Sequence, residues 1–287
     1  MNNVRNFLLS IREVIVLLIV QYAILIGIIL VFGKNNGIVI GTLAIIFIEI
    51  CYIIYKYRKD IFDINIGNNL YFPYVLLGTG IAVIYNMIIF KLGIINDVTN
   101  IDIFINIIAT AIIGPIFEEI LFRYSLINKL EIYFSRKWSI WLSTIIFALC
   151  HTGIYTMIFA FIIGIVNGYL YSTKRDILIP IFVHISANMI ATFLFGYNSV
   201  ILILGFLLII ISYFIIKRKN RAFIGSAGYY PRFRGVNRLR DGLQRRAGEP
   251  FPGNRCSNPG GARMPSPPLL VWRAACRMPA GAGGQPH

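Results

Sequence analysis

Charged residues are scarce in this chain: Asp, Glu, Lys and Arg make up 14% of its 287 residues, and hydrophobic residues make up 57%. Its mean hydropathy is +0.72. This balance excludes an ordinary soluble globular protein and indicates a protein that crosses a membrane several times. Cysteine is also rare, and the four cysteines are too scattered for a disulfide framework: Cys51, Cys150, Cys256 and Cys276.

Several motifs of common enzyme classes are missing. The sequence has no His-Glu-x-x-His motif of zinc proteases and no Gly-x-Ser-x-Gly motif around a serine nucleophile. It also has no Walker A motif and no Gly-x-Gly-x-x-Gly motif. These absences argue against an ATP-driven pump and a nucleotide-dependent enzyme. No internal repeat is visible, whereas transporters often carry inverted repeats.

The formal net charge of +15 is unevenly distributed. Residues 1–220 carry 16 basic and 10 acidic residues, and residues 221–287 carry 11 arginines and 2 acidic residues. The last Lys is Lys219 and the last Ile is Ile224, after which Arg, Gly, Pro and Ala dominate. We therefore predict a membrane domain over 1–220 and a largely disordered tail over 221–287. The abrupt change favours a fused, frame-shifted or vector-derived tail, and the alternative is a basic arm on anionic lipid. We expect no nucleic-acid partner.

The apolar stretches predict an all-α fold, a polytopic membrane bundle of about eight transmembrane helices. They lie at about 13–32, 37–55, 70–90, 103–127, 138–152, 154–172, 177–195 and 199–216. The first is too long for a signal-peptide core and has no small-residue cleavage site, so we expect it to remain as an anchor.

Basic residues are concentrated before the first stretch and after every even-numbered one. They are Arg5 and Arg12; Lys56, Arg58 and Lys59; Lys129, Arg136 and Lys137; Lys174 and Arg175; and Lys217, Arg218, Lys219 and Arg221. Because basic loops favour the cytoplasmic side, both termini are predicted to be cytoplasmic in a multi-pass protein of a cell membrane.

Two adjacent carboxylates and an arginine interrupt the fourth apolar stretch, in Gly114-Pro-Ile-Phe-Glu-Glu-Ile-Leu-Phe-Arg123. Ionisable groups at this depth usually face a protein interior and serve a function. On a helix Glu119 and Arg123 share a face and can form an ion pair, whereas Glu118 points about 100° away. We predict that the pair supports the site and that Glu118 is available for chemistry. Pro115 is expected to kink the helix and to open room for water.

Three further polar residues fall in later apolar stretches: His151 follows Phe147 by four positions, and His184 and Asn188 lie four apart on one helix face. A Glu–His pair can hold and deprotonate water, and a second His with an Asn amide can donate to an oxyanion. Glu118, His151 and His184 could instead bind zinc with an open position for water. The residues alone leave both possibilities open. The purely structural alternatives are a buried ion pair that fixes helix packing and hydrogen bonds that hold helices together. Asn167 is predicted to make such an interhelical contact.

The ordered patterns Glu118-Glu119-x-x-x-Arg123, Phe147-x-x-x-His151 and His184-x-x-x-Asn188 resemble the three motifs of the type II CAAX prenyl endopeptidase family. This family is also called the CPBP intramembrane metalloproteases or the Abi family, and it includes bacterial members tied to bacteriocin processing and self-immunity. The resemblance covers about residues 100–195, and no position departs from the motif pattern.

The resemblance implies roles for these residues. Glu118 and His151 would activate the hydrolytic water, His184 and Asn188 would stabilise the oxyanion, and Glu119 and Arg123 would support the site. It also implies a hydrolase that acts on a peptide or membrane-protein substrate within the lipid bilayer of a bacterium, with the need for zinc left open. The alternative is a non-catalytic immunity or binding protein, or a transporter, that uses the same buried polar cluster.

Overall fold

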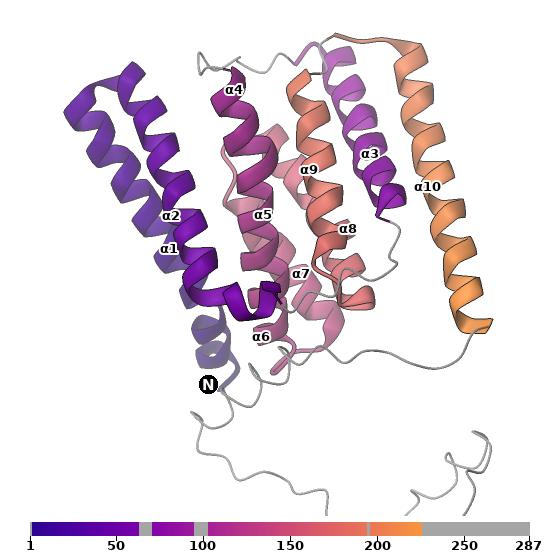
Figure 1. Cartoon of the computed structure of the whole chain (residues 1–287), viewed down its shortest axis with the longest axis horizontal. Coiled ribbons are helices and arrows are strands. Elements are labelled where there is room, and N and C mark those ends of the chain that lie inside the picture. Colours follow the sequence, from indigo (N-terminus) through magenta and orange to yellow (C-terminus); the bar gives the residue numbers. More distant parts are fainter. Residues whose placement is uncertain (1, 63–70, 95–102, 194–195, 226–287) are drawn as a thin grey trace, which may run out of the picture. The chain divides into compact units, whose positions relative to one another are not determined.

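The structure, a computed structural model, describes residues 2–62, 71–94, 103–193 and 196–225. All of them fall within one compact unit, Met1–Ala247. Within these ranges the chain is all-α, with eight helices, which confirms the predicted fold class and the number of helices (Figure 1). The predicted tail lies outside the described ranges except for its first five residues, which continue the last helix to Gly225.

Seven of the eight helices are regular, and the fourth is a composite of α-helical and π-helical segments. The regular ones are α1 (Asn2–Phe32), α2 (Lys34–Phe62), α3 (Phe72–Lys91), α7 (Arg136–Leu149), α8 (Ile154–Lys174), α9 (Leu178–Phe193) and α10 (Ser199–Gly225). The composite helix consists of α4 (Ile103–Asn106), η1 (Ile107–Ile113), α5 (Gly114–Glu119), η2 (Ile120–Ile127) and α6 (Asn128–Leu130).

Five helices in the described ranges are long and apolar enough to cross a membrane, so the chain is a multi-pass membrane protein. They are the segments Val4–Phe32, Lys34–Arg58, Phe72–Lys91, Ile154–Lys174 and Ser199–Arg218. Two other predicted spans are shorter than a complete span requires, because α7 has 14 residues and α9 has 16. At a rise of about 1.5 Å per residue they extend roughly 21 and 24 Å, against about 30 Å of hydrocarbon. Eight helices are therefore present, but α7 and α9 do not have the length of a complete span.

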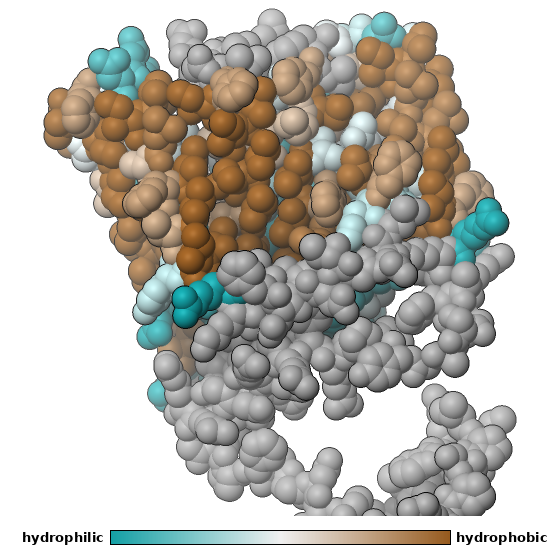
Figure 2. Space-filling view, in the orientation of Figure 1, coloured by the Kyte–Doolittle hydropathy of each residue, from teal (hydrophilic) through white to brown (hydrophobic). Residues whose placement is uncertain are grey.

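The outer surface of the helices is apolar, as contact with lipid requires. Only 11% of the apolar window in α1, and the same share in α10, is buried inside the protein. Figure 2 shows a broad hydrophobic band across the helices, with the most hydrophilic residues at its edges. In water such a surface would be strongly unfavourable, whereas acyl chains solvate it without penalty.

The composite helix occupies the centre of the packing. Every residue from Glu119 to Asn128 is buried. Its apolar side chains form a core with residues of α1, α7 and α8: Phe117, Leu121, Phe122, Leu126 and Leu130 pack with Val14, Phe147, Ala148 and Ala160. The carboxylate pair predicted to carry chemistry therefore lies on the helix with the most neighbours, which fixes its position.

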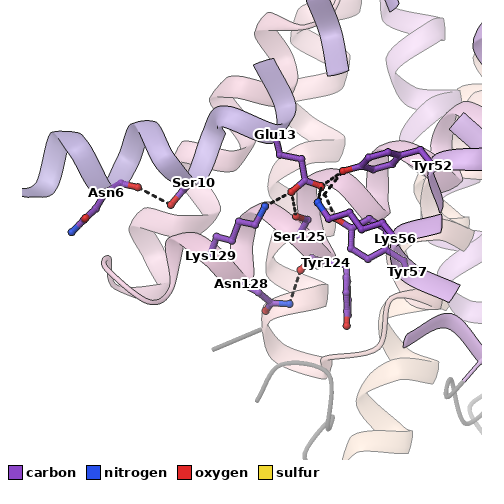
Figure 3. Close-up of polar contacts among 10 residues, drawn as sticks. All are labelled: Asn6, Ser10, Glu13, Tyr52, Lys56, Tyr57, Tyr124, Ser125, Asn128 and Lys129. Carbon is purple, nitrogen blue, oxygen red and sulfur yellow. Dashed lines mark hydrogen bonds and ion pairs between the residues drawn. The ribbon is translucent and has the colours of Figure 1, made fainter. Parts of the chain in front are cut away.

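A polar network attaches the α1–α2 hairpin to the composite helix (Figure 3). The half-buried carboxylate of Glu13 on α1 is its hub. Glu13 accepts hydrogen bonds or ion pairs from five side chains, namely Tyr52, Lys56 and Tyr57 of α2, Ser125 of η2 and Lys129 of α6. In a membrane, where apolar side chains give no hydrophobic drive between helices, such polar contacts help to specify which helices associate.

Helix α9 is held on its other side by α3. The two helices approach so closely at Gly78 that a Cβ atom there would lie 2.1 Å from the carbonyl oxygen of Val183. Only glycine permits this approach. Since Val183 precedes His184, the glycine sets how near α9 and its histidine can lie to the rest of the protein.

Candidate active site

The composite helix carries its two carboxylates on one short α-helical segment between two π-helical stretches. Segment α5 begins at Gly114, with Pro115 in its first turn, and ends at Glu119. Stretch η1 precedes it and η2 follows it. The sequence predicts a kink at Pro115, and the structure instead adjusts the hydrogen-bond register to π on either side. π-Helical turns inside α-helices often occur at functional sites.

Glu118 and Glu119 point in different directions, as their positions on a helix predict. The side chain of Glu119 is fully buried, whereas that of Glu118 is 31% exposed. Glu119 is thus enclosed by protein groups, and Glu118 is accessible to a bound molecule.

Glu119 is the centre of a buried polar cluster that joins three helices. Its Oε2 lies 3.0 Å from Nε of Arg123, which confirms the predicted ion pair. Its Oε1 lies 2.8 Å from Nδ1 of His184 on α9 and accepts a hydrogen bond of 2.9 Å from the amide of Asn167 on α8. A buried carboxylate with this many partners is stable, but it becomes strongly unfavourable when one partner is lost.

Arg123 is fully buried and is stabilised partly by an aromatic ring. The centre of its guanidinium lies 4.6 Å from the centroid of the Phe147 ring, a distance typical of a cation–π interaction. Its Nη1 and Nη2 atoms have no hydrogen-bond partner within the described part of the chain. The charge of Arg123 is therefore balanced chiefly by Glu119 and by the face of Phe147.

His184 lies between the two carboxylates. Because the Oε1 of Glu119 is a carboxylate oxygen, Nδ1 of His184 donates to it. The other ring nitrogen, Nε2, lies 3.7 Å from Oε2 of Glu118. That distance exceeds a hydrogen bond, so a small polar atom bound beside both groups can contact each of them. His184 thus links the buried carboxylate to the accessible one.

His151 lies at the end of α7 and is only partly buried. Its Nδ1 is 2.9 Å from the carbonyl oxygen of Phe147, so Nδ1 carries the proton and Nε2 is left as the basic nitrogen. No hydrogen bond or ion pair joins His151 to Glu118 among the described residues. The two histidines instead share one neighbour, because the Phe147 ring packs edge-on against His151 at 4.8 Å and His184 at 5.8 Å between centroids.

Asn188 follows His184 by one turn of α9. Its amide nitrogen donates a hydrogen bond of 2.8 Å to the carbonyl oxygen of Thr110 in η1. An amide NH₂ group has two hydrogens, so one N–H remains for another acceptor. Asn188 therefore lies next to the composite helix, on the same helix as His184.

Two residues outside the three motifs also contribute to the site. The interhelical contact predicted for Asn167 is confirmed, because its amide donates to Glu119 and also, at 3.2 Å, to the carbonyl oxygen of Pro180. Glu49 of α2 is buried, accepts a hydrogen bond of 2.9 Å from Gln21, and is close enough to Glu118 for their charges to interact. A polar residue in an apolar stretch is the signal that marks both.

Whether zinc could bind here depends on the positions of the side chains that would coordinate it. Zinc requires three protein ligands within about 2.0–2.2 Å of one point. Among the described residues, which include Glu118, His151 and His184, no group of three His, Cys, Asp or Glu side chains is arranged to hold a metal ion. A hydrogen bond from Nδ1 to a protein oxygen, which each histidine makes, is usual for zinc-binding histidines and leaves Nε2 available, so the mismatch lies in the spacing of the three side chains. These residues, in this arrangement, do not fit a zinc site.

Comparison with known proteins agrees with the motif pattern. Residues 100–190 match the model of a family described as type II CAAX prenyl endopeptidase Rce1-like. A protein of Bacillus subtilis (strain 168) with the name "Putative membrane peptidase YdiL" is 31% identical over 86 residues. The match covers 29% of this chain and 34% of that protein, about a third of its length. No solved structure matches the chain. The resemblance inferred from the three motifs is confirmed over residues 100–190.

Proposed function

We propose that this chain, whose residues 100–190 match the Rce1-like type II CAAX prenyl endopeptidase family, is an intramembrane endopeptidase that hydrolyses peptide bonds with water activated by glutamate and histidine. The observation that supports this most directly is the meeting of one accessible carboxylate with one buried carboxylate and a histidine between them. Glu118, Glu119 and His184 form this group, with Arg123 balancing its charge.

Hydrolysis begins with the removal of a proton from water by Glu118, while the water oxygen attacks the carbonyl carbon of the substrate. His151 helps to hold the same water molecule through its Nε2 atom, after a local movement that brings the imidazole closer to Glu118. Catalytic contacts are often long in the absence of substrate, so the lack of a direct contact between His151 and Glu118 is compatible with this role.

The attack places negative charge on the former carbonyl oxygen. The second N–H of Asn188 and, when both of its ring nitrogens are protonated, Nε2 of His184 donate hydrogen bonds to that oxygen. Before the attack the two carboxylates, the guanidinium and this imidazolium sum to zero charge. The sum stays zero after it, because Glu118 is then neutral and the substrate oxygen carries the negative charge. Glu118 then gives its proton to the nitrogen of the leaving amine as the C–N bond breaks.

The location and orientation of the protein in the membrane are part of the proposal. In this proposal all eight helices lie in the cell membrane of a bacterium. Both termini face the cytoplasm, because basic residues gather in the C-terminal parts of α2, the composite helix, α8 and α10. The substrate is a peptide or the tail of a membrane protein. It approaches the exposed side of the Glu118 carboxylate.

The test is hydrolysis of a library of fluorogenic peptides by purified protein in liposomes. Wild type would be compared with Glu118→Gln and His151→Ala, each with and without a zinc chelator. The proposal expects hydrolysis by wild type, its loss in both variants, and no effect of the chelator. Equal hydrolysis by wild type and Glu118→Gln would contradict the assignment of the base. Chelator-sensitive hydrolysis would contradict the metal-free mechanism.

A further inference from the structure

Glu49 is a buried acid beside the candidate site that the proposed mechanism leaves unused. It lies on α2, within the segment Lys34–Arg58, which is long and apolar enough to cross a membrane. The residue is only 8% exposed. A carboxyl group at this depth is costly, and such groups usually serve a function. The position and the protonation of Glu49 indicate what that function is.

The packing of α2 against α5 places Glu49 beside Glu118. One turn after Glu49, the ring of Tyr52 packs edge-on against the ring of Phe117, with 6.2 Å between centroids. Ile53, four residues after Glu49, packs against the same core as Phe117. Phe117 directly precedes Glu118 in the sequence. This face of α2 therefore lies on α5, and the charges of Glu49 and Glu118 are close enough to interact.

One proton is best placed on Glu49. Two neighbouring carboxyl groups resist simultaneous ionisation, and burial favours the neutral form. The side chain of Glu118 is 31% exposed and lies 3.7 Å from Nε2 of His184, so its charge is partly solvated and near a group that can become cationic. Glu49 is more deeply buried, and its hydrogen-bond partner among the described residues is the neutral amide of Gln21. An ionised Glu49 would also add a charge to a site whose charges otherwise cancel.

The hydrogen bond from Gln21 orients this neutral carboxyl group. Nε2 of Gln21 on α1 donates to Oε1 of Glu49 at 2.9 Å. A protonated carboxyl group has one oxygen that carries the hydrogen and one that only accepts. Since Oε1 already accepts from an amide, it is the accepting oxygen. The hydrogen is then carried by Oε2, which has a donor to offer to a neighbouring group.

We propose that Glu49 is a positioning residue for Glu118. As a neutral acid it donates a hydrogen bond from Oε2, directly or through one water molecule, to one oxygen of the Glu118 carboxylate. The other oxygen of Glu118 stays free to take the proton from the hydrolytic water. The bond also stabilises the ionised form of Glu118, which is the form that a base requires. The inference rests on the proposed peptidase function for its catalytic consequence, although the place of the proton does not depend on that function.

A purely structural role for Glu49 makes different predictions. In that role Glu49 only accepts the hydrogen bond of Gln21 and so holds α1 to α2. Glu49 would then need no proton, and removing either partner of the bond would have the same effect. Infrared spectroscopy tests the proton, and enzyme kinetics test the donor.

The infrared experiment uses the whole chain in liposomes at neutral pH. The C=O stretch of a protonated carboxyl group is separate from the bands of carboxylates and amides. The proposal expects this band in wild type, its loss in Glu49→Gln and its persistence in Glu118→Gln. Glu13→Gln is the control and should keep the band, because Glu13 is paired with two lysines and is ionised. A band unchanged in Glu49→Gln, or removed equally by Glu118→Gln, would overturn the proposal.

The kinetic experiment compares kcat and KM for a peptide that the wild type hydrolyses. A hydrogen bond to a charged group changes a rate by about 10–100-fold, so Glu49→Leu should lower kcat by that factor with KM nearly unchanged. Glu49→Gln should keep kcat close to wild type, because its amide supplies a neutral donor. Gln21→Leu should lower kcat less than Glu49→Leu. Thr42→Val is the matched control on α2 and should leave kcat unchanged, since the Thr42 hydroxyl bonds only within its own helix.

The outcomes separate this inference from the peptidase function. Equal decreases of kcat in Glu49→Leu and Gln21→Leu, or equal decreases in Glu49→Leu and Glu49→Gln, would overturn the positioning role while leaving the hydrolysis intact. An infrared band that Glu49→Gln removes, in a protein that hydrolyses no peptide, would instead contradict the peptidase function and confirm the proton on Glu49.

Discussion

Replacing Glu119 by glutamine is expected to destabilise the protein more than any other single change in the candidate site. The substitution keeps the shape of the side chain and removes its charge. Arg123, which is fully buried, then loses its counter-ion, and Nδ1 of His184 loses a charged acceptor. Breaking a buried ion pair by removing one partner costs about 3–5 kcal/mol. The cation–π contact with Phe147 remains and offsets only about 1–2 kcal/mol of the lost interaction.

The assay is unfolding of the purified protein by SDS titration in mixed micelles. Glu118→Gln is the matched control, since Glu118 is partly exposed and lies 3.7 Å from Nε2 of His184, beyond hydrogen-bond distance. We expect that control to lie within about 0.5 kcal/mol of wild type. The double variant Glu119→Gln/Arg123→Met should recover much of the loss, because a buried ion pair can be replaced by apolar groups at little cost.

Two results would refute this reasoning. One is a Glu119→Gln protein as stable as Glu118→Gln. The other is a double variant that is destabilised by the sum of the two single changes, since additivity would mean that the residues do not act as a pair.

Three further predictions concern helix packing and are measured by the same titration. Gly114→Ala should destabilise by about 1–3 kcal/mol, because its Cβ would lie 2.8 Å from the carbonyl oxygen of Ala109, and a neutral effect would contradict this close approach. Glu13→Gln should lose about 1–3 kcal/mol with its ion pairs, whereas Ser10→Ala, whose hydroxyl bonds only within α1, should have little effect; equal effects would argue against the network of Figure 3. Asn167→Leu should destabilise by about 1–3 kcal/mol, because the amide donates to Glu119 and to the carbonyl of Pro180, and an unchanged midpoint would contradict that role.

Much of the fold could be predicted from the sequence because lipid imposes a simple pattern. Apolar runs separated by basic loops gave the number of helices and their approximate bounds. Helix length was harder to predict, since α7 ends at Leu149, three residues before its apolar run does. The backbone N–H groups of Cys150 and His151 donate to carbonyl oxygens of the last turn of α7, and hydropathy does not record such a turn.

The features of the candidate site that depend on spacing within one helix could be predicted. The four-residue spacing of Glu119 and Arg123 predicts their pair, and the different direction of Glu118 predicts its exposure. Contacts between helices are not encoded in spacing. The bond from Asn188 to Thr110 and the attachment of the hairpin through Glu13 depend on tertiary packing, and they become visible only in the structure.

The roles of the site residues remain predictions, and the turnover number of Glu118→Gln tests the central one most directly. A general base contributes about 10²–10⁴-fold to the rate of hydrolysis. The account predicts a decrease of kcat of that size in liposomes, with a stability equal to that of wild type. Glu131→Gln, which removes a carboxylate paired with Arg175 away from the site, should keep most of the activity. A Glu118→Gln protein that cleaves the same peptide as fast as Glu131→Gln would contradict the account.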